Sequence, residues 1–399
     1  MNIIYLTFSD NINVNSSGVH IDLMKEFQNQ GHQVYVVCPL ERRYKKKTYL
    51  DTKDGINVLR VWTFNLKKAN LIEKGVGTVL VEYQFKKAIN EFLHNINFDL
   101  ILYSTPPITF PQVIRCLKQL NPNAVSYLVL KDIFPQNAVD LKMISKYGIL
   151  YRFFRWKEKK LYNVSDYIGC MSPANVSYLL INNPQIDPFK VEIAPNSVIN
   201  YKLEAIDKNS ILKKYGLPVD KPIFLYGGNL GKPQGIDFLI ECLDMNKFRD
   251  DCFFVIVGGG TEYEKIVNWY NNNKIQNCKV FSTIRKEDYD KLVRACDVGL
   301  IFLNHSFTIP NYPARLLSYL QFHLPIIAAT DLNSDVGTIA EKNGYGYWCE
   351  SNSVEDFTKC IDKMLMSNIK EMGEKGYNYY LANYQTVNTY NKIIKHLSL

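Results

Sequence analysis

The fold of this chain is decided by one stretch, Pro222-Ile223-Phe224-Leu225-Tyr226-Gly227-Gly228-Asn229-Leu230-Gly231. Its first half is apolar and rich in β-favouring side chains, which predicts a buried strand, and its second half is rich in glycine. The pattern recurs where the apolar run 253–257 leads into Gly258-Gly259-Gly260-Thr261-Glu262. Glycines at the carboxyl ends of parallel strands let the backbone approach a phosphate, so both loops indicate an α/β domain that binds a phosphate-containing ligand.

The first half of the chain alternates β-rich runs with helical periodicity, which also predicts a parallel sheet with crossover helices. The expected strands are 2–8, 33–38, 56–62, 99–103, 125–130, 166–170 and 190–194; those of the second half are 222–226, 253–257, 278–281, 298–302, 325–328 and 346–348. A length of 399 residues exceeds what one hydrophobic core usually organises. We therefore expect two α/β domains in tandem, with a ligand in the cleft between them.

Composition excludes several other classes of protein. A hydrophobic content of 47% with 13% aromatic residues is too high for a largely disordered chain. Polar residues and prolines interrupt every long apolar stretch, so no membrane-spanning helix is expected. The first residues resemble a strand rather than a signal peptide, which predicts a cytoplasmic protein. The nine cysteines form no Cys-x-x-Cys pair and the histidines no His-x-x-x-His pair, so reduced core thiols and no metal site are expected.

The excess positive charge lies in the first half, where residues 1–200 contain 24 Lys and Arg against 16 Asp and Glu. It is concentrated at 42–47 and 152–160, and bases alternate with Phe and Trp in the second cluster. This mixture suits an anionic membrane surface, although a solvated face is an alternative, and no known motif supports nucleic-acid binding. The residues expected at the membrane are Arg42, Arg43, Lys45, Lys46, Lys47, Arg152, Arg155 and Trp156. A stripe of Tyr147, Tyr151, Phe154 and Leu161 suggests a membrane-facing helix, with packing as the alternative.

Taken in order, these motifs resemble glycosyltransferase family four, a family of retaining enzymes built from two Rossmann-like domains, the glycosyltransferase B fold. The resemblance covers nearly the whole chain. The residues that carry it are Gly18, Gly31-His32, Pro195-Asn196, the stretch 227–232, the stretch 258–262, Pro313-Ala314-Arg315-Leu316-Leu317-Ser318-Tyr319 and Leu324-Pro325-Ile326-Ile327. Asp132-Ile133-Phe134-Pro135 is similar to an element of bacterial enzymes that build O-antigen and capsule repeat units.

The resemblance implies an acceptor-binding domain at 1–197, a nucleotide-sugar-binding domain at 198–376 and a helix at 377–399 that returns to the first domain. It implies transfer of a sugar from a nucleotide donor, with a uridine diphosphate sugar expected, to a lipid-linked saccharide at the inner face of the cell membrane, without metal or other cofactor. Two alternatives stay open within the same fold. They are a nucleotide-sugar 2-epimerase and a pseudoenzyme that binds a nucleotide sugar as a partner subunit.

The chain departs from the family at several positions. The glutamate pair expected at 310 and 318 is replaced by Pro310 and Ser318, and the arginine and lysine of the first glycine loop are replaced by Asn229 and Gln234. A small residue before the Pro-Ile-Ile strand is replaced by His323, which we expect to be a satisfied core residue.

From the resemblance, Lys232 and Arg315 are expected to neutralise the charge that develops on the leaving diphosphate, and they are our catalytic candidates together with Asp132. Asp132 follows the strand 125–130 and could orient the acceptor hydroxyl, with helix capping as the alternative. His20 could contact phosphate or acceptor, with packing as the alternative. The expected donor-binding residues are Gly18, Gly228, Asn229, Gly231, Lys232, Gly259, Gly260, Thr283, Ile284, Arg315, Leu316, Ser318 and Asp335.

Overall fold

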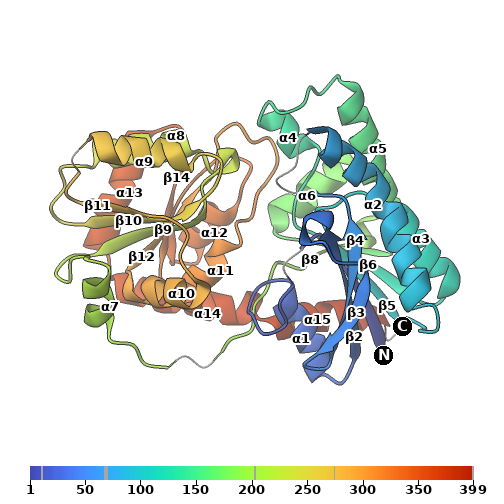
Figure 1. Cartoon of the computed structure of the whole chain (residues 1–399). Coiled ribbons are helices and arrows are strands. Elements are labelled where there is room, and N and C mark those ends of the chain that lie inside the picture. Colours follow the sequence, from blue (N-terminus) through green and yellow to red (C-terminus); the bar gives the residue numbers. More distant parts are fainter. Residues whose placement is uncertain (10–11, 67–70, 202–203, 274, 398–399) are drawn as a thin grey trace. The chain divides into compact units, whose positions relative to one another are not determined.

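The structure, a computed structural model, describes residues 1–9, 12–66, 71–201, 204–273 and 275–397 (Figure 1). It divides into two compact units. Unit 1 consists of Met1–Ile199 together with Gln385–Leu399, and unit 2 consists of Asn200–Tyr384. The boundary expected after residue 197 therefore lies after Ile199, and the boundary expected after residue 376 lies after Tyr384.

Unit 1 is built on an eight-stranded sheet with the order β3-β4-β2-β1-β5-β6-β7-β8. The strands are β1 (Asn2–Leu6), β2 (Gln33–Glu41), β3 (Tyr49–Lys53), β4 (Ile56–Thr63), β5 (Leu100–Ser104), β6 (Val125–Leu130), β7 (Tyr167–Cys170) and β8 (Val191–Ile193). All neighbours pair in parallel except β3, which is antiparallel to β4. All seven predicted strands of this half are present. Strand β3 was not predicted, because its mostly exposed side chains give this edge strand no buried face that a sequence pattern could reveal.

Helices cover both faces of this sheet. The helices are α1 (Ile21–Asn29), α2 (Leu71–Phe92), α3 (Pro111–Leu120), α4 (Gln136–Asp140), α5 (Ile149–Val164) and α6 (Pro173–Asn182), with short 3-10 turns η1 (Arg42–Tyr44) and η2 (Pro188–Lys190). Figure 1 shows α2, α3 and α5 on one side of the sheet and α1 on the other. The core under α2, α3 and α5 includes Phe85, Ile114 and Leu161, which are almost completely buried.

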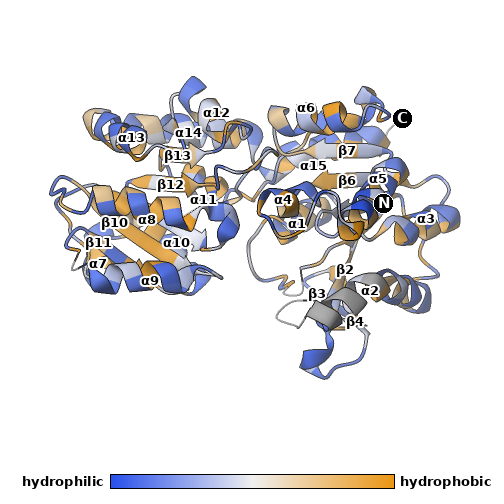
Figure 2. Cartoon of the chain, turned by 90° about the horizontal axis from the view of Figure 1, so that it is seen from above, coloured by the Kyte–Doolittle hydropathy of each residue, from blue (hydrophilic) through white to orange (hydrophobic). Residues whose placement is uncertain are grey.

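Unit 2 is built on a fully parallel six-stranded sheet with the order β11-β10-β9-β12-β13-β14. The strands are β9 (Ile223–Asn229), β10 (Phe253–Gly259), β11 (Cys278–Phe281), β12 (Val298–Phe302), β13 (Ile326–Thr330) and β14 (Gly346–Glu350). All six correspond to predicted strands. Their apolar runs are continuous rather than alternating because both faces are covered, and β10 and β12 stand out as hydrophobic in Figure 2.

The helices of unit 2 also form two layers. They are α7 (Lys208–Lys214), α8 (Ile236–Met245), α9 (Tyr263–Asn272), α10 (Lys286–Ala295), α11 (Arg315–Gln321), α12 (Val336–Lys342), α13 (Val354–Met366) and α14 (Ile369–Asn383), with the turn η3 (Lys232–Gln234). In Figure 1, α8, α9 and α13 lie on one face of the sheet, and α7, α10 and α14 lie on the other. Both units are thus Rossmann-like, which confirms the predicted fold class.

The final helix predicted at 377–399 is wrong as a single element. Helix α14 continues to Asn383, and a new helix, α15 (Thr386–Ile394), begins after Gln385 and is followed by η4 (Lys395–Leu397). Residues 398–399 lie outside the described residues. Helix α15 belongs to unit 1, where Tyr390 packs edge-on against Phe27 of α1, with ring centroids 5.0 Å apart, and its hydroxyl bonds to His32 at 2.9 Å.

No helix within the described ranges is both long and apolar enough to cross a membrane. All nine cysteines are reduced thiols, and eight of them are buried.

The packing of α15 predicts a large effect at Ile393, whose side chain is completely buried. Ile393→Ala should lower the free energy of unfolding of unit 1 by about 2–5 kcal/mol, because it removes buried methyl groups and leaves a cavity. The measurement is urea denaturation. The matched control is Ile181→Ala, since Ile181 is 77% exposed and its truncation should change stability by less than about 0.5 kcal/mol. Equal effects of the two substitutions would show that α15 does not complete the core of unit 1.

Candidate functional site

A pocket of about 470 Å³ lies at the carboxyl ends of β9 and β10 in unit 2. The first residues of α10 and α11 and the loop after β11 complete it. The residues that line it are Gly227, Gly228, Asn229, Val257, Gly258, Gly259, Thr283, Ile284, Lys286, Tyr289, Arg315 and Ser318. In open parallel sheets this edge is where ligands bind, so the position of the pocket agrees with the fold.

The two glycine loops form the floor of this pocket by packing backbone against backbone. A Cβ on Gly258 would lie 1.8 Å from the carbonyl oxygen of Gly228, and a Cβ on Gly260 would lie 2.3 Å from the carbonyl oxygen of Leu230. The Leu230 amide donates to the carbonyl of Gly259 at 2.9 Å. Any residue other than glycine at 258 or 260 would push the two loops apart. The two glycine motifs found in the sequence therefore depend on each other.

Arg315, at the start of α11, has a guanidinium group whose hydrogen-bonding capacity the protein only partly satisfies. Its Cζ lies 4.3 Å from the centroid of the Tyr226 ring, and Nη2 donates a long hydrogen bond of 3.4 Å to the carbonyl of Asn229. Its Nη1 is buried and has no hydrogen-bond partner within the described part of the chain. Burying a charged donor without a partner is costly, so this atom is suited to an anion that enters the pocket.

Two tyrosines shape the wall beside Arg315. A Cβ on Gly227 would lie 1.9 Å from the Tyr289 hydroxyl, so that hydroxyl rests directly against the first glycine of the loop. The amide of Gly227 donates to the Tyr319 hydroxyl, which in turn donates to the carbonyl of Leu225 at 3.1 Å. Burial holds the pKa of Tyr289 well above its ordinary value, so its hydroxyl stays protonated and able to donate.

The structure brings seven of the predicted donor-binding residues together in this pocket: Gly228, Asn229, Gly259, Thr283, Ile284, Arg315 and Ser318. Gly231 and Gly260 belong to the same two loops without lining the pocket, and Leu316 points into the core. Lys232 is exposed in η3 and Asp335 begins α12, and neither lines the pocket. Gly18 lies in unit 1, where its amide donates to Asp22 at 3.1 Å at the start of α1.

Sequence reasoning missed Tyr289 and Lys286. Both belong to α10, whose sequence gives an ordinary amphipathic pattern with no glycine or motif to single them out. Lys286 is paired with Asp290 one helical turn away, at 2.6 Å, so it is not an uncommitted cation.

The two neutral replacements in the first glycine loop are partners of each other. The side-chain amide of Asn229 donates to Oε1 of Gln234 at 2.8 Å, and the Gly231 amide donates to the same oxygen at 3.2 Å. The amide pair therefore holds the loop closed by uncharged hydrogen bonds. Arg315 is left as the principal positive charge lining the pocket.

His20, Tyr5 and Lys131 form a polar cluster in unit 1. Nδ1 of His20 lies 2.5 Å from the Tyr5 hydroxyl and 3.1 Å from Nζ of Lys131. Burial lowers the pKa of Lys131 to about 7, although the adjacent Asp132 carboxylate acts in the opposite direction. Asp132 itself is exposed after β6, and its amide donates to Thr105 at 3.1 Å. His20 is thus held by polar contacts rather than by apolar packing.

A second pocket, of about 230 Å³, lies in unit 1 between the loop after β6 and helices α5 and α6. Its lining is rich in tyrosines, amides and bases: Ile133, Pro135, Gln136, Lys146, Tyr151, Arg155, Glu158, Tyr162, Tyr178, Leu179, Asn182 and Asn183. Arg155 holds its wall together, because its guanidinium donates to Glu158 at 2.5 Å and to Asn183 at 2.7 Å. Burial raises the pKa of Tyr178 above its ordinary value, so its hydroxyl also stays protonated.

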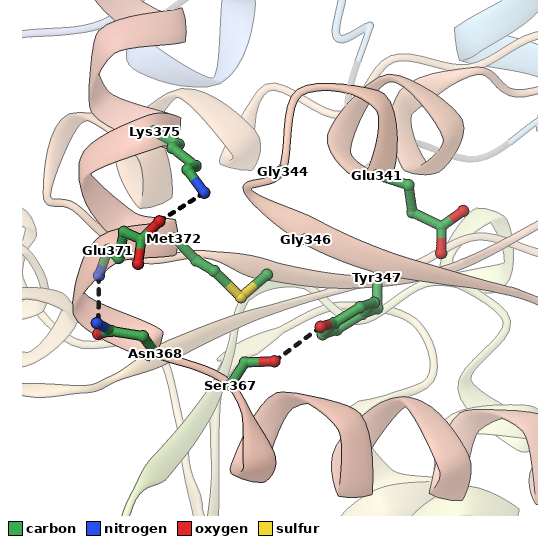
Figure 3. A pocket seen from close by; sticks show the side chains of 9 residues that line it. All are labelled: Glu341, Gly344, Gly346, Tyr347, Ser367, Asn368, Glu371, Met372 and Lys375. Carbon is green, nitrogen blue, oxygen red and sulfur yellow. Dashed lines mark hydrogen bonds and ion pairs between the residues drawn. The ribbon is translucent and has the colours of Figure 1, made fainter.

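A third pocket, of about 400 Å³, lies between β14 and the start of α14 (Figure 3). Its polar side chains bond to one another, as Tyr347 does to Ser367 at 2.7 Å and Lys375 to Glu371 at 2.7 Å. It contains no predicted site residue, and we assign no ligand to it.

The basic clusters predicted to contact a membrane are only partly free. Arg42 pairs with Glu73 at 3.2 Å, and Arg43 pairs with Glu41. Lys45, Lys46 and Lys47 are exposed, as are Arg152 and Trp156. Arg155 is only 20% exposed and points into the second pocket, so it is unsuited to membrane contact.

The described residues contain no group of three or more His, Cys, Asp or Glu side chains that could hold a metal ion.

Comparison with known proteins identifies the domain that holds the first pocket. Residues 207–379 match the family described as "Glycosyl transferases group 1". This part of the chain is similar to the group 1 glycosyltransferases. The chain is also 20% identical over 328 residues to the probable glycosyltransferase WbjE of Pseudomonas aeruginosa, covering 79% of each protein. It is 24% identical over 162 residues to the putative colanic acid biosynthesis glycosyl transferase WcaI of Escherichia coli K12, covering 40% of this chain and 39% of that protein.

Solved structures extend the similarity in fold to the whole chain. Sucrose-phosphate synthase from Thermosynechococcus elongatus matches with a TM-score of 0.75 at 14% identity, covering 99% of this chain and 97% of that one. Anabaena Alr3699/HepE in complex with UDP-glucose matches with a TM-score of 0.70 at 13% identity, covering 100% of this chain and 99% of that one. These matches confirm the glycosyltransferase B fold.

The lowered pKa of Lys131 predicts a pH dependence of stability. Between about pH 7 and the ordinary lysine pKa, the unfolded chain binds a proton at Lys131 that the folded chain does not, so this residue makes stability rise with pH. The stability of the wild type relative to Lys131→Met should increase from pH 7 to pH 9 by at most about 1.4 kcal/mol per pH unit. Denaturant unfolding of both proteins at the two pH values measures this difference. A constant difference would show that Lys131 keeps an ordinary pKa.

Proposed function

We propose that this protein transfers a sugar from a uridine diphosphate sugar to a hydroxyl of a lipid-linked saccharide in the synthesis of a bacterial surface polysaccharide. The match of residues 207–379 to the group 1 family supports the transfer reaction, and the names of WbjE and WcaI support polysaccharide synthesis. The HepE complex with UDP-glucose, a protein of the same fold, supports a uridine diphosphate donor.

The observation that carries the donor proposal is the buried, unpartnered Nη1 of Arg315 beside the two glycine loops. A diphosphate would complete the hydrogen bonding of this atom, while the glycines let its oxygens approach the backbone. As the bond between sugar and phosphate breaks, negative charge grows on the diphosphate, and a fixed guanidinium stabilises that charge. Ser318 and Thr283 then supply hydroxyl contacts to the nucleoside. We propose no metal in this step, and retention of configuration remains part of the proposal.

The acceptor proposal draws on unit 1. The second pocket, about 230 Å³ in volume, combines tyrosine rings with side-chain amides, and this mixture recognises sugars through stacking and hydroxyl hydrogen bonds. Asp132, exposed just before Ile133 and Pro135 of that pocket, would orient the acceptor hydroxyl. His20 is proposed as a further polar contact for phosphate or acceptor.

One experiment tests the reaction. The protein is incubated with a panel of nucleotide sugars, with and without an extract of lipid-linked saccharides, and the products are analysed by mass spectrometry. Release of nucleoside diphosphate that depends on the extract supports transfer. Isomerisation of the free donor would favour a 2-epimerase, and binding without turnover would favour a nucleotide-sugar-binding partner subunit.

Arg315→Ala should lower kcat about 100-fold while the KM for the donor changes little. The loss corresponds to about 3 kcal/mol in the transition state, where the charge on the diphosphate is greatest. Arg315→Lys should restore only part of the rate, since an ammonium cannot make the bidentate contact of a guanidinium. Steady-state kinetics with a saturating acceptor measure both parameters.

The comparison variant is Lys232→Ala. The sequence favoured an equal role for Lys232, but its exposed position outside the pocket lining predicts a smaller loss than for Arg315→Ala. A wild-type kcat in Arg315→Ala would mean that the diphosphate binds elsewhere.

A further inference from the structure

The solvent-facing side of α5 and the loop before it carry an unusual set of exposed apolar side chains. Tyr147 and Ile149 are each 86% exposed, Met143 is 65% exposed and Leu150 is 59% exposed. Trp156 and Phe153 are also exposed, at 47% and 37%. Single exposed apolar residues are common on soluble proteins, whereas a contiguous group of this kind marks a surface that contacts another apolar phase. We call these six residues the α5 surface.

Helical geometry brings together the four members of this surface that belong to α5. Ile149, Phe153 and Trp156 are spaced by four and three residues, so they lie along one side of α5, and Leu150 lies beside them. The opposite side of the helix is buried against unit 1 through Glu158, Leu161 and Tyr162. Phe154, which the sequence placed in a membrane-facing stripe with Leu161, instead packs against Phe134 with ring centroids 4.9 Å apart. Of the stripe predicted from the sequence, Tyr147 belongs to the α5 surface, whereas Phe154 and Leu161 lie on the packed side of the helix. Tyr151 lines the second pocket.

The bases of the same segment divide into two classes. Two of them form ion pairs within unit 1: Arg155 pairs with Glu158 at 2.5 Å, and Lys157 pairs with Glu82 at 2.7 Å. The other bases make no ion pair among the described residues: Lys142, Lys146, Arg152, Lys159 and Lys160. The one acidic residue between 141 and 160 is Glu158, which is buried, so the exposed part of the segment carries positive charge alone.

We infer that the α5 surface docks this protein on an anionic lipid bilayer, with the apolar side chains entering the interface and the free bases contacting lipid phosphates. An apolar stripe bordered by lysine and arginine is the arrangement by which interfacial helices bind membranes. A tryptophan and a tyrosine at the border suit the headgroup region, because each has an apolar ring and a polar tip. Lys160 lies 3.7 Å over the Trp156 ring, which places a cation at the same level.

This inference deepens the proposed function, since a lipid-linked acceptor would be met at such a surface. Lys146 and Tyr151, from the same segment, line the second pocket, so a lipid held at the α5 surface would have its polar head beside that pocket. Docking on lipid is nevertheless a separate property, and it can be measured without a nucleotide sugar or any turnover.

The experiment is flotation of the full chain with vesicles of phosphatidylcholine alone or with about one third phosphatidylglycerol. We expect binding to the anionic vesicles, weakening as salt is raised because charges at a lipid surface are screened. Arg152→Glu combined with Lys159→Glu should weaken the affinity at least about 25-fold, given about fivefold for each base lost. The matched control is Lys342→Glu combined with Lys370→Glu, which makes the same change in net charge at exposed lysines of unit 2 and should leave binding unchanged within about twofold.

A second pair of variants isolates the apolar contribution. Ile149→Ser combined with Leu150→Ser should weaken binding even at high salt, because the loss does not depend on charge. Its control is Phe189→Ser, which removes an apolar side chain that is 94% exposed elsewhere in unit 1. Thermal unfolding of each variant verifies that folding is retained.

Equal binding of the wild type to neutral and anionic vesicles would overturn the inference, as would wild-type binding by both pairs of α5 variants. Self-association in sedimentation that these variants abolish, without vesicle binding, would assign the surface to a second copy of the chain instead. Turnover of the donor in solution tests the proposed function, whereas vesicle flotation tests docking on lipid. If either property fails its test, the other can still be measured.

Discussion

The close approach of two backbone segments, Gly228 and Gly258, is the constraint on which the first pocket of unit 2 depends. With a Cβ position only 1.8 Å from the Gly228 carbonyl oxygen, position 258 admits glycine alone, and the parallel pairing of β9 with β10 continues to this point. Because the loops stay in contact, their glycines open toward the same side of the sheet as Arg315 and Tyr289. The pocket therefore forms because the pairing of β9 with β10 continues into their glycine loops.

The sequence was a good guide wherever burial sets the pattern. Strands of a parallel sheet are covered on both faces, so their apolar runs are visible from composition alone, and thirteen of the fourteen strands in the described ranges were expected. The missed strand, β3, lies at a sheet edge with a mostly exposed face. The break between α14 and α15 was also missed, because apolar spacing continues through Tyr384, which is itself buried, and no proline or glycine marks the change of unit.

Side-chain partners were harder to foresee than elements. Asn229 and Gln234 looked like two separate losses of charge, and only the structure shows that they bond to each other. His323 was expected in the core, and this was wrong: its side chain is 42% exposed, stacks on Tyr377 with centroids 4.0 Å apart and bonds to Glu374. Its backbone φ of +61° explains why a small residue suits that position, since the left-handed region favours glycine. Neither partner adjoins His323 in sequence, so no local pattern could reveal them.

The departures from the family pattern have one common effect, which is on the net charge of the pocket. A loop closed by the neutral Asn229–Gln234 pair contributes no positive charge, and Ser318 contributes no negative charge. The cation and the carboxylate expected there are both absent, so two opposite charges are lost together. The net charge of the site therefore changes less than if only one of them were missing. What remains is Arg315, oriented by the Tyr226 ring and one backbone carbonyl, with one nitrogen unsatisfied. A site of this kind is suited to an anion that is held by one well-placed guanidinium and backbone groups, and the hydroxyls of Ser318 and Thr283 add only neutral contacts to it.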